Sequence, residues 1–290
     1  MERCRIIAIL NGKGGVGKTT TTINLGTALW LLGRRVLLID ADPQCNLTLT
    51  MDRTAYGMKE GTLYEWMTDE DYDQEGHFLP TYTKYDGLDY VPASMQMESL
   101  NTWLINQTKR EDYLSDRLSL LRPHYDYVLI DCAPAIESLL NTNVLVAADA
   151  IIVPTRTDLF GMQSQSLMQE RIQEIRKKFR KDLPILGYLL TQYERTRIDR
   201  SISDYFKGVQ EVTLFRHPIR KCTRCRECIN EQMSLFEYDA GCTAADDYMM
   251  LAEDVDGVNP RPKKSTPAEW GRRAKEAFSE FIRNQEKERQ

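Results

Sequence analysis

The feature that most constrains this chain is a glycine-rich segment directly after its first apolar run. Residues Arg5–Leu10 are largely apolar, and Asn-Gly-Lys-Gly-Gly-Val-Gly-Lys-Thr-Thr follows over residues 11–20. Glycines let backbone N–H groups surround a phosphate in conformations that a Cβ would obstruct. A helix beginning at Lys18 would direct the positive end of its dipole at the same anion. The segment therefore predicts a phosphate-binding loop between a buried strand and a helix.

The spacing Gly12-x4-Gly17-Lys18-Thr19 fits the Walker A motif of nucleoside triphosphatases. We expect Lys18 to reach the β- and γ-phosphates and the Thr19 hydroxyl to bind Mg²⁺. The predicted nucleotide-binding residues of the loop are Gly12, Lys13, Gly14, Gly15, Val16, Gly17, Lys18, Thr19 and Thr20.

Carboxylates follow two further apolar runs. Asp40 and Asp42 come after Val36–Ile39, and Asp131 comes after Tyr127–Ile130. In doubly wound sheets, ligands lie at the carboxyl ends of the strands, where these side chains are expected. Four apolar residues followed by an aspartate have the form of a Walker B segment, so we expect Asp131 to hold Mg²⁺ through water.

Short apolar runs alternate with longer amphipathic stretches, a pattern typical of a mostly parallel, doubly wound α/β sheet with helices on both faces. Strands are predicted at Arg5–Leu10, Arg35–Ile39, Leu88–Val91, Tyr125–Ile130, Ala150–Pro154 and Ile185–Thr191, with a weaker one at Glu211–Leu214. Helices are predicted at Lys18–Leu32, Glu98–Asn106, Lys109–Leu121, Ser138–Ala147, Gly161–Arg180, Asp199–Val209 and Thr243–Asp254.

Composition predicts a cytoplasmic globular protein. The 290 residues are 42% hydrophobic and 28% charged, and no apolar run reaches the roughly 18–20 residues needed to span a bilayer. The N-terminus has no secretory cleavage pattern, which favours reduced thiols for the seven cysteines. The net charge of -5 argues against a wholly basic nucleic-acid binder, although a local basic face remains compatible with it.

Lys13 makes the loop more specific, because Lys-Gly-Gly-x-Gly-Lys-Thr is the signature of the ParA/MinD group of ATPases, which this chain resembles. Residues 40–46 resemble the family pattern Asp-x-Asp-Pro-Gln-Gly-Asn, with Cys45 in place of the usual glycine. Residues 187–193 and 240–253 also resemble family segments. Together they favour the ParA/Soj branch of the deviant Walker A P-loop ATPases.

The resemblance implies ATP and Mg²⁺ as cofactors and assigns roles within the site. Lys13 would reach the nucleotide of a partner subunit, Asp42 would orient the attacking water, and Asp40 would lie near the metal shell. The catalytic residues that it implies are Lys13, Lys18 and Asp42, and the metal-holding residues are Thr19, Asp42 and Asp131.

The resemblance also implies an ATP-driven homodimer that binds double-stranded DNA nonspecifically and is reset by hydrolysis that a ParB-like partner stimulates. The phosphate loop begins at residue 12, so we expect no N-terminal helix-turn-helix extension. The expected role is segregation of a plasmid, chromosome or mobile element by a nucleoid-associated protein. Basic residues of the C-terminal half are the candidate DNA contacts: Arg195, Arg197, Arg216, Arg220 and Lys221.

Residues 1–256 are predicted to form the ParA-like ATPase domain, with a surface excursion at about 50–87 that contains one short helix. A linker is expected at 257–265 and an amphipathic helix at 266–290. The apolar stripe of that helix comprises Trp270, Ala274, Ala277, Phe278, Phe281 and Ile282. The stripe packs on the ATPase body or a second subunit, or lies on a membrane as in a MinD-like spatial regulator.

A cysteine triplet, Cys222-x2-Cys225-x2-Cys228, departs from the family pattern, and Cys242 follows it. The spacing suits thiolates that bind zinc or an iron–sulfur cluster, as in a metal-cluster carrier ATPase. The alternative is a basic loop with free thiols, because arginine and lysine surround the triplet and only three cysteines are local.

Overall fold

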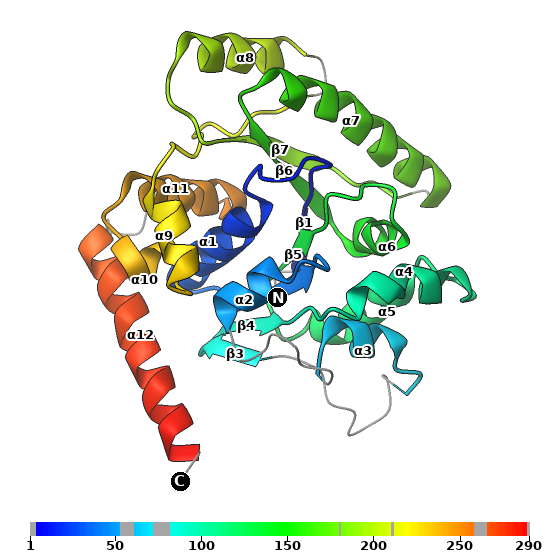
Figure 1. The fold of residues 1–290 in the computed structure, drawn as a ribbon, viewed down its shortest axis with the longest axis horizontal. Helices are drawn as coiled ribbons and strands as arrows, with labels where there is room; N and C mark the ends of the chain where they lie inside the picture. Colours follow the sequence, from blue (N-terminus) through cyan, green and yellow to red (C-terminus); the bar gives the residue numbers. More distant parts are fainter. Residues whose placement is uncertain are drawn as a thin grey trace.

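A seven-stranded sheet runs through the molecule (Figure 1). The computed structural model describes residues 4–52, 61–71, 82–179, 181–209, 212–257 and 266–288. Within these residues the strands are β1 (Arg5–Ile9), β2 (Val36–Ala41), β3 (Tyr82–Tyr85), β4 (Leu88–Val91), β5 (Tyr127–Cys132), β6 (Ala150–Arg156) and β7 (Ile185–Thr191). Their order is β3-β4-β2-β5-β1-β6-β7, and only the β3–β4 pair among these is antiparallel. The predicted doubly wound, mostly parallel fold is confirmed.

Helices cover both faces of this sheet. They are α1 (Lys18–Leu31), α2 (Asn46–Met51), α3 (Leu63–Thr68), α4 (Met97–Ile105), α5 (Tyr113–Leu121), α6 (Leu139–Ala147), α7 (Leu159–Phe179), α8 (Arg197–Gly208), α9 (Arg224–Asn230), α10 (Leu235–Asp239), α11 (Thr243–Asp256) and α12 (Pro267–Glu288). One core cluster joins the sheet to α3 through α8, and the other joins it to α1, α2, α10, α11 and α12.

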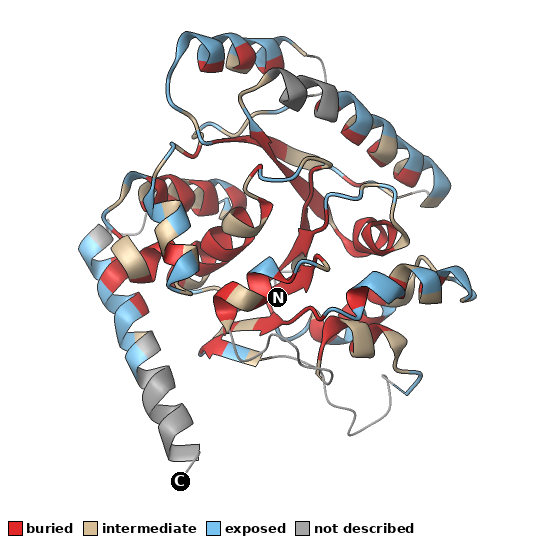
Figure 2. Cartoon of the chain, in the orientation of Figure 1, coloured by how far each residue is buried: buried red, intermediate tan, exposed pale blue. Residues whose placement is uncertain are grey.

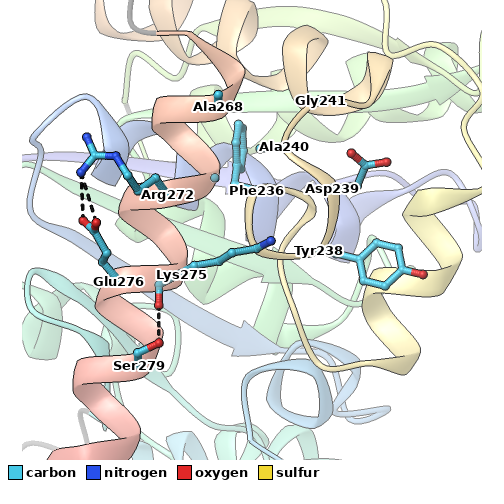
Figure 3. A pocket seen from close by; sticks show the side chains of 11 residues that line it. Phe236, Tyr238, Asp239, Ala240, Gly241, Ala268, Arg272, Lys275, Glu276 and Ser279 are labelled. Carbon is cyan, nitrogen blue, oxygen red and sulfur yellow. Dashed lines mark hydrogen bonds and ion pairs between the residues drawn. The ribbon is translucent and has the colours of Figure 1, made fainter.

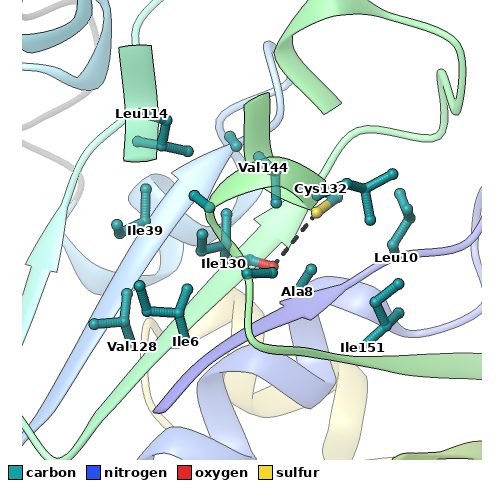
Figure 4. Close-up of a cluster of buried hydrophobic side chains, with 14 of the residues drawn as sticks. Ile6, Ala8, Leu10, Ile39, Leu114, Val128, Ile130, Cys132, Val144 and Ile151 are labelled. Atoms are coloured by element: carbon teal, nitrogen blue, oxygen red, sulfur yellow. Dashed lines mark hydrogen bonds between the residues drawn. The ribbon is translucent and has the colours of Figure 1, made fainter. Parts of the chain in front are cut away.

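Alternate residues of one strand reach the two cores. Ile6 and Ala8 belong to the first cluster (Figure 4), whereas Ile7 and Ile9 belong to the second. All residues of β2 and β5 are buried, as Figure 2 shows for the centre of the molecule. Continuous apolar runs form these strands because each strand is covered on both faces.

The described parts of the predicted surface excursion are packed against the body. Leu63, Trp66 and Met67 of α3 are buried in the first core, and β3 forms an antiparallel edge strand on β4. The buried Arg117 of α5 donates to the Trp66 and Asp69 carbonyl oxygens. The short helix predicted within this segment is present as α3, and its buried apolar face packs in the core.

The weaker strand predicted at Glu211–Leu214 is not formed in its described part. Leu214 makes one isolated parallel bridge to Tyr188, and Glu211 lies outside the described residues. Three short helices, α2, α9 and α10, were not predicted. Each has five to seven residues, too few for hydrophobic periodicity to indicate a helix.

The C-terminal helix α12 packs on the ATPase body through α10, β3 and α1. Trp270 is buried and meets the Phe236 ring edge-on at 6.2 Å, and Arg273 donates to the Leu31 carbonyl oxygen at 2.6 Å. Farther along, α12 and α10 line an open cavity of about 800 Å³ (Figure 3). The apolar stripe is therefore covered by protein as far as its side chains are described. Those of Phe278, Phe281 and Ile282, and nearly all of the predicted linker, lie outside the described residues.

Candidate phosphate-binding site

The glycine-rich loop joins β1 to α1, and part of its backbone has a conformation that favours glycine. Gly17 caps the N-terminus of α1 with φ of +90°, in the left-handed region that favours glycine. Gly12 lies close to Ile136: a Cβ at this position would lie 2.3 Å from Cδ1 of Ile136, so that side chain would have to move. The loop therefore uses Gly17 for its backbone conformation, and Gly12 lies close to the segment after β5.

Contacts from β6 and β7 hold the loop open. The Thr191 hydroxyl donates to the Val16 carbonyl oxygen at 2.8 Å, and the Gln192 amide donates to the Gly15 carbonyl oxygen at 3.3 Å. The Asn11 amide donates to the Pro154 carbonyl oxygen at 2.7 Å, while its oxygen accepts from the Lys13 backbone N–H. Two loop carbonyl oxygens are thus occupied by side chains that end or follow β7, and the Lys13 N–H is occupied by Asn11.

The Lys18 ammonium is turned back into the loop. It donates to the Lys13 carbonyl oxygen at 3.2 Å, and the residue is only 7% exposed. Burial lowers the pKa of Lys18, whereas the neighbouring carboxyl of Asp131 raises it. A desolvated ammonium with one backbone acceptor is suited to bind a phosphate oxygen, as predicted from the sequence.

Two buried carboxyl groups lie on neighbouring strands beneath the loop. Asp40 of β2 and Asp131 of β5 are paired in register, and both are fully buried. Burial raises the pKa of Asp131 well above its usual range, and the charge of Asp40 raises it further. Neither side-chain oxygen of Asp131 has a partner at hydrogen-bonding geometry, although the Thr19 hydroxyl is close enough to lower the pKa. A buried carboxylate with unused oxygens fits a cation that is held through water.

Asp40 also has a structural role beside Asp131. Its carboxylate accepts from the Thr48 N–H and hydroxyl at 2.8 and 2.7 Å and from the Asp42 N–H at 3.1 Å. Burial raises the pKa of Asp40 to about 6, although these hydrogen bonds lower it. Asp40 therefore fixes the turn that carries Asp42. Thr48, whose hydroxyl also accepts from the Ala93 N–H, was missed because its partner lies eight residues earlier.

Asp42 lines the cavity beside the loop. Its Oδ1 accepts from the Gln44 N–H at 3.0 Å, which directs the carboxylate along the turn. The cavity measures about 410 Å³, and its lining residues are Gly14, Gly15, Gly17, Lys18, Thr19, Thr20, Asp42, Gln44, Asn46, Pro134, Gln192 and Ile229. The structure thus brings the predicted Lys18, Thr19 and Asp42 together. Gln192 and Ile229, which come from distant segments, were not predicted.

Lys13 faces a different cavity. Its ammonium lies 2.6 Å from Oδ2 of Asp158, and about a quarter to a third of each side chain is exposed (27% and 32%). Lys13 lines a second cavity of about 880 Å³ together with Gly12, residues 134–138 and the α7 residues Leu167, Glu170, Arg171 and Glu174. It is absent from the lining of the cavity that contains Lys18 and Asp42. The two signature lysines therefore line two different cavities, which share Pro134 as a lining residue.

The predicted DNA contacts divide into two groups. Arg195, Arg197 and Arg216 are exposed near the start of α8 and in the segment after it. In contrast, Arg220 donates to both Asp247 oxygens at 2.7–3.0 Å, and Lys221 pairs with Glu194 at 2.8 Å. The structure does not bring these five residues into one patch of unengaged charge.

The fold and the loop define a P-loop nucleoside triphosphatase. A family model described as an AAA domain matches residues 4–185. The sporulation initiation inhibitor protein Soj of Bacillus subtilis is 31% identical over 87% of this chain and 98% of its own length. The chromosome partitioning protein ParA of Caulobacter vibrioides is 35% identical over 87% of this chain and 93% of its own. The chain therefore belongs to the ParA/Soj family and is an ATPase.

A solved structure of a cobyrinic acid a,c-diamide synthase from Mycobacterium smegmatis, with bound ADP and magnesium, shares this architecture. It is 26% identical with a TM-score of 0.73, over 90% of this chain and all of the other. The fold thus occurs in proteins with differently named activities. Among the residues that the structure describes, no helix has the length and apolar character needed to cross a membrane.

Proposed function

We propose that this protein is an ATP-dependent DNA partitioning ATPase whose dimerisation is driven by ATP. The observation that carries the proposal is that the two signature lysines line different cavities. Lys18 lines the cavity that also contains Thr19 and Asp42, whereas Lys13 lines the neighbouring cavity formed with α7. A lysine in that position is suited to the phosphates of a second subunit, in the manner of an arginine finger.

ATP and Mg²⁺ fit the first cavity. The loop N–H groups and Lys18 would hold the phosphates, and Thr19 with Asp131 would hold Mg²⁺, which neutralises the charge that develops on the transferred phosphoryl group. Asp42, fixed by Asp40 and Gln44, lines the same cavity and would orient the attacking water. Hydrolysis then gives ADP and phosphate.

The Lys13–Asp158 ion pair supports a switch between two states. In the single chain Asp158 neutralises the lysine. In the proposed dimer the γ-phosphate of the partner's ATP would replace Asp158, because a phosphate offers more charge than one carboxylate. ATP binding and dimerisation would thereby be coupled, and hydrolysis would return Lys13 to Asp158.

Nonspecific DNA binding is assigned to Arg195, Arg197 and Arg216, which are exposed on the α8 side. Exposed arginines contact phosphates whatever the sequence, so binding would release counterions and weaken with salt. Arg220 and Lys221 would contribute only after leaving Asp247 and Glu194. The cycle would place the protein on the nucleoid, with a ParB-like partner that stimulates hydrolysis and a plasmid, chromosome or mobile element as cargo.

The test is binding to arbitrary duplex DNA with ATP, ADP or no nucleotide over a range of salt concentrations. We expect binding with ATP alone and a steep loss of affinity as salt rises. Lys13→Ala should retain ATP in the monomer and lose both dimer and DNA. Equal DNA binding with ADP and ATP would contradict the proposal.

The two alternatives receive less support. A MinD-like membrane role requires an available apolar face on α12, but Trp270 and Ala274 are buried against the body. A metal-cluster carrier requires grouped ligands. Within the described residues, no three His, Cys, Asp or Glu side chains are placed together to hold a metal ion. Flotation of the protein with liposomes would support the membrane role, and bound iron in the purified protein would support the metal-cluster role.

A further inference from the structure

A short turn, residues 192–196, joins the end of β7 to α8. Two of its residues, Gln192 and Arg195, have φ of 53° and 63°, in the left-handed region that residues other than glycine rarely adopt. Such conformations cost energy and persist only where the surrounding contacts fix them. Gln192 lines the nucleotide cavity, whereas Arg195 is exposed beside α8. The turn therefore connects the nucleotide cavity to the candidate DNA contacts.

The start of the turn is fastened to the phosphate loop. The Gln192 amide donates to the Gly15 carbonyl oxygen at 3.3 Å. The Thr191 hydroxyl, one residue earlier, donates to the Val16 carbonyl oxygen at 2.8 Å. Any change of the loop on phosphate binding therefore reaches the start of the turn through two hydrogen bonds.

The end of the turn is held by Asp199 of α8, which is buried and only 5% exposed. Its Oδ2 accepts from the Glu194 and Thr196 N–H groups at 3.0 and 2.9 Å, and its own N–H donates to the Thr196 hydroxyl at 3.1 Å. The contacts with Thr196 form a capping box at the N-terminus of α8. Asp199 thus fixes the backbone on both sides of Arg195 and at the start of the helix that carries Arg197.

The other carboxylate oxygen of Asp199 is bound from a different part of the fold. It accepts from the hydroxyl of Thr157, in the segment between β6 and α7. The next residue is Asp158, whose carboxylate pairs with the Lys13 ammonium at 2.6 Å. Because Thr157 and Asp158 are adjacent in the chain, a change in the partner of Lys13 acts on the group that holds Asp199.

We propose that Asp199 is a positioning residue that couples the state of the phosphate loop to the presentation of Arg195 and Arg197. When a phosphate takes the place of Asp158 at Lys13, the Thr157 segment is released from the loop and shifts Asp199 together with the turn that it holds. The inference rests on the proposed function for its output, which is DNA binding. The conformational link itself does not require DNA.

The first experiment breaks the link outside the capping box. Thr157→Val replaces the hydroxyl with a methyl group and leaves the contacts of Asp199 with the turn in place. We expect ATP binding and dimer formation to be retained. The ratio of the affinity for duplex DNA with ATP to that with ADP should fall by about fivefold or more, the range in which coupled sites affect one another.

Two further variants control this measurement. Thr157→Ser keeps the hydroxyl and should restore the affinity ratio. Ser201→Ala removes a hydroxyl that donates to the Arg197 carbonyl oxygen within α8, so it should leave the ratio unchanged. A fall of the same size in all three variants would overturn the assignment, because it would follow from loss of any hydroxyl near α8.

Hydrogen–deuterium exchange of the full chain gives a readout that does not depend on DNA. In wild type, ATP with Mg²⁺ should change exchange in the phosphate loop and also in α8. In Thr157→Val the change in the loop should remain and the change in α8 should be lost. A merely structural role of Thr157 would instead alter exchange in α8 equally with and without ATP.

The outcomes separate this inference from the proposed function. An α8 that does not respond to ATP in wild type, or responds equally in Thr157→Val, would overturn the coupling even if wild type binds DNA only with ATP. An α8 that responds through Thr157 in a protein that binds no DNA would support the coupling and refute the proposed function. An unchanged affinity ratio after loss of the α8 response would overturn Arg195 and Arg197 as its output.

Discussion

Two polar regions of this molecule differ in how many partners the protein supplies to their charged groups. In the phosphate-loop region (residues 11–48 and 127–137), Lys18 contacts a backbone carbonyl and the oxygens of Asp131 have no hydrogen-bond partner. In the post-β7 region (residues 193–247), Arg220 is held by Asp247 and Lys221 by Glu194. A buried polar group without a hydrogen-bond partner in the protein indicates a ligand-binding role. A group whose partners are supplied by the protein indicates a structural role.

The largest effect expected from this contrast is at Lys18. Lys18→Ala removes the desolvated ammonium that no other described side chain replaces in the cavity. We expect nucleotide affinity to fall by about 100-fold or more, since charge-assisted contacts to phosphate are among the strongest in proteins. Titration with a fluorescent ATP analogue measures the change. Tight ATP binding by the variant would show that the loop backbone alone holds the phosphates.

The second prediction separates binding from hydrolysis in the same region. Asp42→Ala should retain ATP but hydrolyse it about 100-fold more slowly, because the water loses its orienting carboxylate. The variant should therefore stay dimeric and trapped on DNA. Phosphate release at the wild-type rate would refute the role assigned to Asp42, and unchanged nucleotide affinity serves as the control.

In the post-β7 region the prediction concerns stability. Arg220→Ala leaves the buried Asp247 carboxylate without its main partner, so we expect the free energy of unfolding to fall by about 1–3 kcal/mol. Arg195→Ala is the matched control, because this exposed arginine should change stability by less than about 0.5 kcal/mol. Urea titrations compare the two. Equal stabilities would mean that Arg220 is not structural.

A smaller effect is expected at Cys45, which occupies a left-handed conformation with φ of 54° at the start of α2. Cys45→Gly and Cys45→Ala both remove the buried thiol, but only glycine relieves the strain of the left-handed backbone conformation. The glycine variant should be more stable than the alanine variant by about 1 kcal/mol. Thermal unfolding of both variants measures this difference, and the reverse order would show that the turn is not strained.

The smallest effect is expected at Asp158, whose ion pair with Lys13 is partly exposed. Asp158→Asn should weaken the hold on Lys13 by less than about 1 kcal/mol, so that dimers form at an ATP concentration about two- to fivefold lower. Analytical ultracentrifugation across ATP concentrations measures the shift. An unchanged midpoint would show that the ion pair does not oppose dimerisation.

Whether a feature could be predicted from the sequence depends on the separation along the chain of the residues that form it. Gly12–Thr20 and Asp131 were predicted because each motif is local and each follows an apolar strand. The contacts of Asp40 with Thr48 were not predicted, because they are identified by hydrogen bonds and not by spacing. Short helices such as α9 were missed for lack of periodicity, and Glu211–Leu214 was overpredicted because β propensity does not supply a pairing strand.

The sequence by itself determined the phosphate loop, the positions of the main strands along the chain and the family, because each depends on residues adjacent in the chain. Only the tertiary structure decided that Lys18 and Lys13 line different cavities and that Arg220 pairs with Asp247. The physical reason is that side-chain partners are chosen by packing between distant elements. The loop's backbone conformation, in contrast, follows from its own glycines.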